Sequence, residues 1–552
     1  MTEENNTKPA RVEISKKLVL INSASSLVTR MLSISVLIWL QQYLLKRITP
    51  EEYSLLPVLY SVMMFAPLIT TILTAGLGRY IVEAYAKHDD ERVTQIVSTM
   101  FPILCATGLI FLAGGWTFAW YIDKVLNIAP ERLWDARIMM ALLMFSAAIT
   151  LPLSAFGAGF FVRQKFVLEN LIGVATEIFR LSILFTLLFG VNTRVLWVVT
   201  ASVSAGFLGQ VIGVIISRRL VPTLRFRPSH IHWPIAKEIT GFGGWSFVMS
   251  LANTVRMALD PIILNVCGTP TDVTCFHIGT MAFRHVQGIS DTARASLDPP
   301  LTALYSKGDT IRLQTVYLRG GRIALWFSLL PALPLFIYAH EFVSLYAGTR
   351  YEQATTVMQL SLLTFPIAYG NTMFFGLCAA MARIRIPAVQ VLLMNVLNLF
   401  LTILFVALLR FGAIGSALAT AFAFAVTYPL FMWPTGRKLV GVSGHTWFKE
   451  TIVPGLFPGA VSGLVWFLAK LVVAPQTWVS LLGCVAFGAS AYIVVLLAAC
   501  FGLEDKKDLR KMICHLPGGK QLLSSKTLAP FTAWILEDKT TREKKEADDQ
   551  QC

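Results

Sequence analysis

Long apolar stretches are the feature that most constrains how this 552-residue chain can fold. Predominantly apolar runs of about 20 residues, the length of a membrane-spanning helix, recur from Leu18 to Gly502. Only 14% of the residues are charged, against about 25% in an ordinary soluble protein. The sequence therefore predicts an all-α polytopic membrane protein, and it excludes a soluble multidomain enzyme and a disordered chain.

The positions of these runs divide the chain into segments. We expect fourteen transmembrane helices, of which the eighth, Val273–Leu301, is unusually polar. The expected segments are an N-terminal cytoplasmic tail (1–17), a first lobe of six helices (18–216), a basic cytoplasmic linker (217–240), a second lobe of six helices (241–436), two further helices (437–502) and a cytoplasmic C-terminal tail (503–552). The loops are short, so we expect no inserted soluble domain.

An internal repeat relates the two expected lobes. Thr49-Pro50-Glu51-Glu52-Tyr53 joins the first two helices, and Thr269-Pro270-Thr271-Asp272-Val273 joins the seventh and eighth, 220 positions later. Arg163-Gln164-Lys165 and Arg383-Ile384-Arg385 show the same offset before the fifth and eleventh helices. Many transporters are built from duplicated halves with the substrate site between them. We therefore expect two pseudo-symmetric six-helix lobes around a central cavity.

The distribution of Lys and Arg predicts the orientation. The chain carries a net charge of +15. With the N-terminus inside, the inner loops hold 19 Lys and Arg residues and the outer loops hold 7. Cytoplasmic loops are enriched in these residues, so we expect a multi-pass protein with both termini in the cytoplasm. The same bias accounts for much of the positive charge without a nucleic-acid partner.

The expected eighth helix carries a stripe of polar residues. Four residues recur every seven positions and two more lie beside the same line: His277, Arg284, Asp291 and Asp298, with Gln287 and Arg294. A step of seven drifts by only about 20° around an α-helix, so these residues share one face. Charged residues are costly in a membrane and rarely face lipid. The stripe therefore lines a wet cavity or forms a salt-bridged seam, and both interpretations stay open.

The first and seventh helices carry further candidates. Arg30 lies near the middle of the first helix, with Ser26 on its face and no acid in that helix. It is suited to contact an anion, although an acid on another helix could also pair with it. In the seventh helix Arg256 and Asp260 lie one turn apart, with Asn253 on the same face, and could neutralise each other.

The candidate residues fall into two groups by chemistry. Basic and polar side chains could line a cationic cavity that holds an anionic, hydroxyl-rich headgroup: Ser26, Arg30, Arg180, Asn253, Arg256, His277, Arg284, Gln287 and Arg294. Acidic side chains could carry a coupling proton or sodium ion: Glu169, Glu177, Asp260 and Asp291. Glu177 and Arg180 are three positions apart and could instead form only a local ion pair. A further cluster, Asn395, Asn398 and Thr402, is expected to bridge helices.

Several classes of function lack their motifs. There is no GxxxxGK[ST] phosphate-binding loop, so ATP is not the expected energy source. The eight cysteines form no CxxC pair and no metal-ligand cluster is present, so we expect no metal or other cofactor beyond a coupling proton or sodium ion. Pairing of Cys267 with Cys275 stays open. The short outer loops leave little room for the catalytic residues of a polymerase, so we expect a transporter rather than an enzyme.

Four stretches resemble one transporter family: Thr49–Tyr53, Gly76–Glu83, Asn395–Leu399 and Phe411–Thr420. They resemble the polysaccharide-transporter branch of the multidrug/oligosaccharidyl-lipid/polysaccharide flippase superfamily, which contains flippases for O-antigen and other lipid-linked oligosaccharides. The resemblance extends from Leu18 to about Phe501. It implies a two-lobed bundle with a cationic central cavity, and it matches Arg30, Asp260 and Arg284 to polar sites of the family.

The resemblance also implies a function. It implies a flippase that translocates polyprenyl-pyrophosphate-linked oligosaccharide across the bacterial inner membrane for O-antigen, capsule or exopolysaccharide assembly. A cation-coupled multidrug exporter of the same fold is the first alternative, and a membrane glycan polymerase or ligase is the second. The expected partners are the lipid-linked substrate, membrane lipids and other membrane proteins of polysaccharide assembly, and the protein is expected to act as a monomer.

Overall fold

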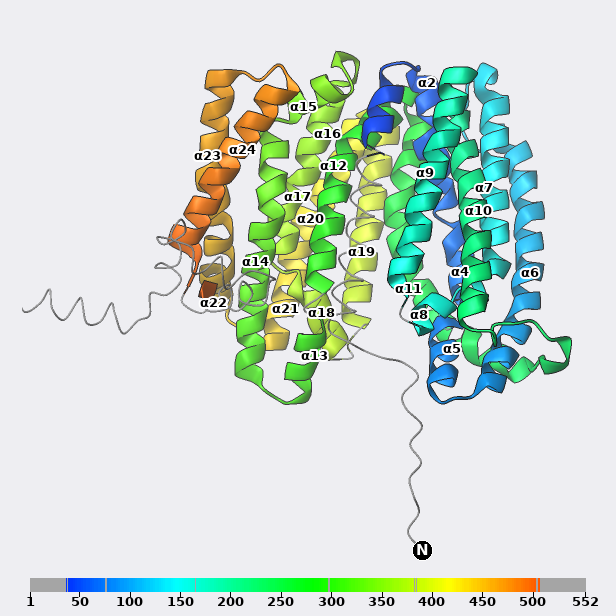
Figure 1. Ribbon diagram of the computed structural model, residues 1–552. Coiled ribbons are helices and arrows are strands. Elements are labelled where there is room, and N and C mark those ends of the chain that lie inside the picture. Colours follow the sequence, from blue (N-terminus) through cyan, green and yellow to red (C-terminus); the bar gives the residue numbers. More distant parts are fainter. Residues whose placement is uncertain are drawn as a thin grey trace, which may run out of the picture. The chain divides into compact units, whose positions relative to one another are not determined.

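A computed structural model describes residues 36, 38–74, 77–163, 165–295, 298–381, 383, 385–502 and 505–506. Contacts group them into two compact units. The first unit comprises the described residues up to Arg284 together with Phe342–Thr364 and Arg383–Phe431. The second comprises His285–Glu341, Phe365–Ala382 and the described residues from Met432 onward. Each unit is described separately below, and Figure 1 labels the helices of both.

The first unit begins with short helices and continues with long ones. Its N-terminal helices are α2 (Pro50–Tyr53), α3 (Leu55–Met63), α4 (Ala66–Thr74), α5 (Leu77–Ala86), α6 (Asp90–Trp120), α7 (Leu133–Ser154), α8 (Gly159–Val162), α9 (Phe166–Gly190) and α10 (Leu196–Leu220). The expected second helix, Tyr53–Gly76, is thus divided between α3 and α4. Pro67 lies in the first turn of α4, where its missing N–H costs little, whereas inside a continuous helix it would clash with the preceding turn.

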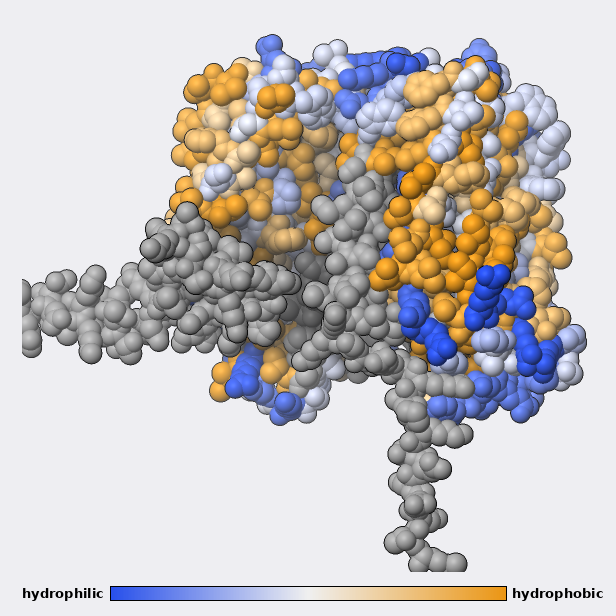
Figure 2. Space-filling model, in the orientation of Figure 1, coloured by the Kyte–Doolittle hydropathy of each residue, from blue (hydrophilic) through white to orange (hydrophobic). Residues whose placement is uncertain are grey.

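Helices from later in the sequence complete the first unit. They are α11 (Trp233–Cys267), the part of α12 (Pro270–Ala295) up to Arg284, α16 (Gln353–Leu362), α19 (Arg385–Thr402) and α20 (Gly412–Thr427). A π-helical segment, η5 (Ile403–Leu408), extends α19. Hydrophobic side chains cover the visible faces of α9 and α10, and hydrophilic ones gather at the end where α5 lies (Figure 2). This pattern suits helices that face lipid.

The connection between α10 and α11 is shorter than expected. Helix α10 continues to Leu220 and α11 begins at Trp233, so both helices extend into the expected 217–240 linker. Hydroxyl groups of α6 hold the remaining segment, because the Thr94 hydroxyl donates to the Thr223 carbonyl (3.0 Å), and the Ser98 and Thr99 hydroxyls accept from the Arg227 and His232 N–H groups (2.9 Å each). These bonds satisfy backbone groups that no helix pairs.

The second unit packs the last helices against α14. Its helices are α13 (Asp298–Ser306), α14 (Thr310–Ile337), α17 (Thr364–Tyr369), α18 (Met373–Ala380), α21 (Trp433–Val440), α22 (Gly444–Trp447), α23 (Val453–Val473) and α24 (Trp478–Val495). Polar tips of buried aromatic residues join them: the Trp326 indole donates to the Pro454 carbonyl (2.8 Å), and the Tyr492 hydroxyl donates to the Trp326 carbonyl (3.0 Å). Aromatic bulk and satisfied polar atoms together stabilise this packing.

A carboxylate beyond α24 is held by two arginines of α14. The Arg319 guanidinium donates to Asp505 Oδ1 at 3.0 and 2.6 Å, and Arg322 donates to Oδ2 at 2.8 Å. The side chain of Asp505 is only 5% exposed. Arg322 also lies over the Trp326 ring, which stacks on Phe501. The first described residues of the expected C-terminal tail are therefore anchored.

The helices confirm the fold class. Nine described helices are long and apolar enough to cross a membrane, and a bent pair, Gln353–Tyr369 with Met373–Ala380, makes ten if it counts as one crossing. The described part of the chain contains no β-strand. The protein is thus an all-α, multi-pass membrane protein, as predicted, and the count of fourteen helices stays a prediction.

Candidate functional site

A small polar cavity lies within the first unit. Its volume is about 120 Å³, and its walls come from α11, α12, α16, α20 and the end of α3. The polar lining residues are Asp260, Thr280, Arg284, Ser361 and Thr420. The apolar lining residues are Met64, Met257, Phe276, Phe283 and Ala417. We call this space the polar cavity.

The carboxylate of the polar cavity comes from α11. Asp260 is 8% exposed, and its Oδ1 accepts a hydrogen bond from the Thr402 hydroxyl of α19 at 3.1 Å. Pro261 follows it inside the helix. Because proline has no N–H, the carbonyl of Met257 loses its helical hydrogen bond next to the cavity. A buried carboxylate and an altered helical turn therefore meet at one place.

The cation of the polar cavity comes from α12. Arg284 lies one turn after Thr280, and its Nη2 donates to the Thr280 hydroxyl at 2.9 Å. A guanidinium carries five N–H donors in a planar fork, and this bond uses one of them. The hydroxyl therefore orients the fork within the wall of the cavity.

Hydroxyl and amide groups of α19 and α20 form hydrogen bonds beside the polar cavity. The Asn398 amide of α19 donates to the Thr420 hydroxyl of α20 at 3.1 Å, and that hydroxyl donates to the Ser416 carbonyl at 3.2 Å. Asn398 is 7% exposed. The predicted role of Asn398 and Thr402 as bridges between helices is consistent with these contacts. Both residues also touch groups that line the polar cavity.

The sequence analysis missed three of the five polar lining residues. Thr280 lies four positions before Arg284, so helical spacing could have added it to the predicted stripe. Thr420 is the last residue of the Phe411–Thr420 stretch that carries part of the family resemblance. Ser361 gave no signal in the sequence, because its place in the cavity depends only on how α16 packs.

Among the described candidates, Asp260 and Arg284 line the polar cavity and others lie elsewhere. Arg180 and Glu177 form an ion pair within α9, with Nε and Oε2 3.0 Å apart, which is the local pairing that the sequence left open. Glu169 is an exposed residue of α9. His277 lies 3.3 Å from the Gln41 amide, with its ring 6.0 Å from that of Tyr53.

Among the candidates whose side chains are described, two belong to the second unit. The backbone carbonyl of Gln287 accepts a 3.5 Å hydrogen bond from the Tyr369 hydroxyl, and Asp291 is exposed. The remaining candidates lie outside the described residues or outside the described side chains: Ser26 and Arg30 in the first case, and Asn253, Arg256 and Arg294 in the second. The side chain of Asp298, from the same stripe, also lies outside the described part.

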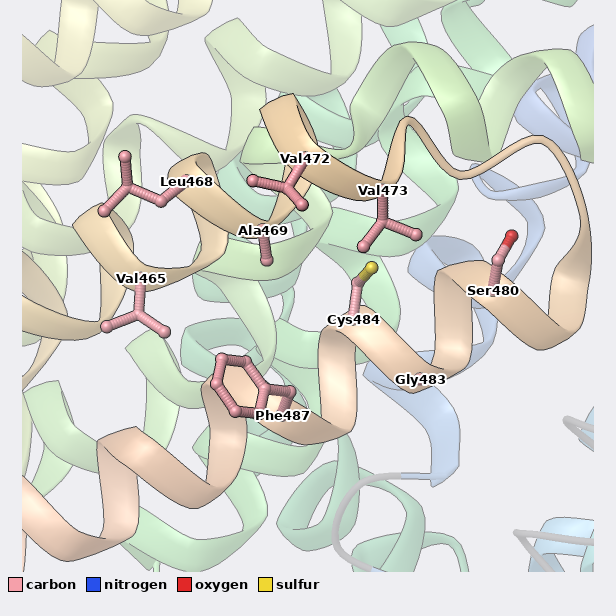
Figure 3. A pocket seen from close by; sticks show the side chains of 9 residues that line it. All are labelled: Val465, Leu468, Ala469, Val472, Val473, Ser480, Gly483, Cys484 and Phe487. Carbon is pink, nitrogen blue, oxygen red and sulfur yellow. The ribbon is translucent and has the colours of Figure 1, made fainter.

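A second, larger cavity is apolar. It measures about 610 Å³, lies between α23 and α24, and is lined by side chains that include Val465, Leu468, Val472 and Phe487 (Figure 3). Ser480 supplies a hydroxyl at one end, and no lining residue is charged. A charged headgroup would lose its hydration there without compensation. The polar cavity is therefore the better candidate for a polar ligand.

Metal and disulfide chemistry find no support in the described residues. Within them, no group of three or more His, Cys, Asp or Glu side chains could hold a metal ion. Cys267 and Cys275, whose pairing the sequence left open, are both free thiols.

Long apolar helices around a polar cavity are the architecture of a membrane transporter. The chain belongs to the family described as polysaccharide biosynthesis protein, whose model matches residues 15–293. This confirms the predicted place in the polysaccharide branch of the flippase superfamily. A relative from Bacillus subtilis (strain 168), described as the uncharacterized membrane protein EpsK, is 21% identical over 499 residues, which cover 89% of this chain and 97% of that protein.

Solved structures show the same fold. The lipid II flippase MurJ in an inward closed conformation matches with a TM-score of 0.62 and 13% identity, over 86% of this chain and 97% of MurJ. An inward-facing multidrug transporter of the MATE family matches with a TM-score of 0.59 and 14% identity, over 73% of this chain and 92% of that one. At these identities the likeness concerns the fold alone.

Proposed function

We propose that the protein is a flippase that moves polyprenyl-pyrophosphate-linked oligosaccharide from the inner to the outer leaflet of a bacterial inner membrane for surface polysaccharide assembly. The observation that carries the proposal is the meeting of Arg284, Asp260 and three hydroxyl groups in one cavity of a polysaccharide-family protein. The polyprenyl tail can stay in lipid, so only the headgroup needs a polar path.

The chemistry of the polar cavity matches such a headgroup. An arginine fork can donate two parallel hydrogen bonds to a phosphate. Asp260 and the hydroxyls of Thr280, Ser361 and Thr420 can exchange hydrogen bonds with sugar hydroxyls. The volume of about 120 Å³ is small for an oligosaccharide headgroup, so passage of a whole headgroup requires the cavity to widen.

Transport needs an energy source, and Asp260 is our candidate for ion coupling. If it carries the coupling ion, Asp260→Asn should remove the dependence of export on the proton or sodium gradient and leave expression normal. The measurement is glycan export at imposed gradients alongside membrane protein level. If protein level falls instead, the carboxylate is a structural partner of neighbouring groups. Thr402→Val, which removes the hydroxyl that contacts Asp260, should shift the gradient dependence less.

We also propose that both termini lie in the cytoplasm, and this orientation makes a separate prediction. Reporter fusions should place Ser229 and the C-terminal tail in the cytoplasm and Ile128 outside. Ser229 lies in the segment held to the N-terminal turns of α6, and Ile128 follows the C-terminal end of the same helix, so the two sites must report opposite sides. A periplasmic C-terminus would contradict an even number of crossings.

The MATE-like fold also supports a cation-coupled multidrug exporter. The two functions differ in the charge of their substrates. Arg284 attracts an anion and repels a cation, so it favours the flippase. A deletion strain that loses surface glycan but keeps its drug resistance would support the flippase. Polymerised glycan formed by the purified protein would support the second alternative, a polymerase or ligase.

A further inference from the structure

Two acidic residues occupy equivalent places in the internal repeat. Glu52 and Asp272 lie 220 positions apart, and each is the third residue of a helix that begins with proline after a threonine. Glu52 Oε1 accepts a hydrogen bond from the Val195 N–H, directly before α10, at 2.9 Å. Asp272 Oδ1 accepts one from the Ala413 N–H, in the first turn of α20, at 3.1 Å. All four residues belong to the first unit.

Each carboxylate is well supplied with donors. The Arg132 guanidinium forms a 2.8 Å ion pair with Glu52, whose side chain is 5% exposed. The second oxygen of Asp272 accepts from the Thr269 N–H at 2.9 Å and from the Thr269 hydroxyl at 2.7 Å. A charged acceptor at the start of a helix satisfies a free N–H group and interacts favourably with the positive end of the helix dipole. Both carboxylates therefore connect two helix beginnings.

A glycine permits the close approach in the second repeat. Gly412 has a φ of +54°, which favours glycine, and a Cβ atom built on it would overlap Asp272 Oδ1. A side chain at this position would therefore push the carboxylate away from the Ala413 N–H.

The hydrogen bond between Asp272 and Ala413 joins the first turns of α12 and α20, and both of these helices line the polar cavity. Thr280 and Arg284 follow Asp272 by about two and three turns along α12. Thr420 follows Ala413 by about two turns on α20. These three side chains line the polar cavity. The bond between Asp272 and Ala413 consequently sets the axial position of one wall against the other.

We propose that Asp272 is a positioning residue for the polar cavity and that Glu52 is its counterpart in the first repeat. Each carboxylate fixes the second helix of its repeat against the sixth. In the second repeat this keeps Thr420 level with Thr280 and Arg284. The role deepens the proposed function and rests on it only for the export measurement described below.

Hydrogen exchange of the full-length protein in nanodiscs tests the two contacts. Asp272→Ala should speed exchange in a peptide covering 411–416 by about fivefold, the effect of losing one ordinary hydrogen bond, and leave 192–197 unchanged. Glu52→Ala should do the reverse. Gly412→Ala keeps the carboxylate but displaces it, so it should reproduce Asp272→Ala. Asp272→Asn keeps one acceptor and should change exchange by less than about twofold. Equal loosening of both peptides, or of neither, would overturn the proposal.

Cysteine labelling tests the positioning itself. Thr420→Cys is treated with N-ethylmaleimide, and modification of its peptide is measured by mass spectrometry. Adding Asp272→Ala or Gly412→Ala should change the labelling rate at least fivefold, whereas adding Glu52→Gln should not. An unchanged rate would refute the positioning role. If labelling changes but glycan export stays intact, the positioning role stands and the proposed function fails.

Discussion

Arg284→Ala is expected to abolish glycan export while membrane protein abundance stays normal. The guanidinium lines the polar cavity and is oriented by Thr280, so its removal deletes the donor fork proposed to hold the pyrophosphate. Losing charged hydrogen bonds worth about 2 kcal/mol corresponds to a fall of about 30-fold in export. The measurement is surface glycan in a complemented deletion strain, with protein level determined in the same membranes. Arg30→Ala should have the same effect, although Arg30 lies outside the described residues.

Two controls separate geometry from charge. Arg284→Lys keeps the charge and loses the fork, so it should restore export only in part. Arg219→Ala removes an exposed arginine at the end of α10 and should leave export unchanged. Normal export in the Arg30→Ala/Arg284→Ala double variant would refute a cationic cavity and leave these arginines as packing partners.

Asp505→Ala should strongly destabilise the second unit. The substitution leaves Arg319 and Arg322 without the carboxylate that joins them, and their side chains are only 23% and 17% exposed. Removing one partner of a buried ion pair costs about 3 kcal/mol or more, because the remaining charge is poorly hydrated. Thermal unfolding followed by tryptophan fluorescence should detect the loss, since Trp326 contacts both Arg322 and Phe501.

A charge-matched control is available in the same unit. Glu450 is exposed, so Glu450→Ala should change stability by less than about 0.5 kcal/mol. Asp505→Asn should fall between the two, because it keeps one acceptor oxygen and loses the charge. If Asp505→Ala unfolds like Glu450→Ala, the contact with α14 contributes nothing to stability.

The length and apolarity of its helices made this fold predictable. An apolar run of sufficient length specifies a transmembrane helix with little help from its neighbours, which is why long helices such as α6, α9 and α10 were found from the sequence. The repeat was also visible, since Glu52 and Asp272 lie within the two related stretches. Breaks within a helix were less predictable, because Pro67 is compatible with either a kink or a new helix start.

The candidate site was only partly predictable. Asp260 and Arg284 stood out because a charge inside a membrane needs a reason. Ser361 and Thr420 are ordinary hydroxyl residues, and only the packing of α16 and α20 brings them to the cavity. The sequence analysis did not predict that Asp505 is buried. A charged residue beyond the last helix is usually solvated, and nothing in the local sequence indicates that α14 supplies two arginines to bury it.

The contact between Thr402 and Asp260 lies where α19 changes its winding. Thr402 is the last α-helical residue before η5, whose π turns hold one residue more than an α turn. That extra residue corresponds to a rotation of about 100° around the helix axis. A wide turn can migrate along a helix by exchanging one hydrogen bond at a time. If η5 moved one residue toward the N-terminus, Thr402 would swing away from Asp260 while the helix stayed intact. Migration of this π turn can thus make or break the contact between Thr402 and Asp260 without bending the helix.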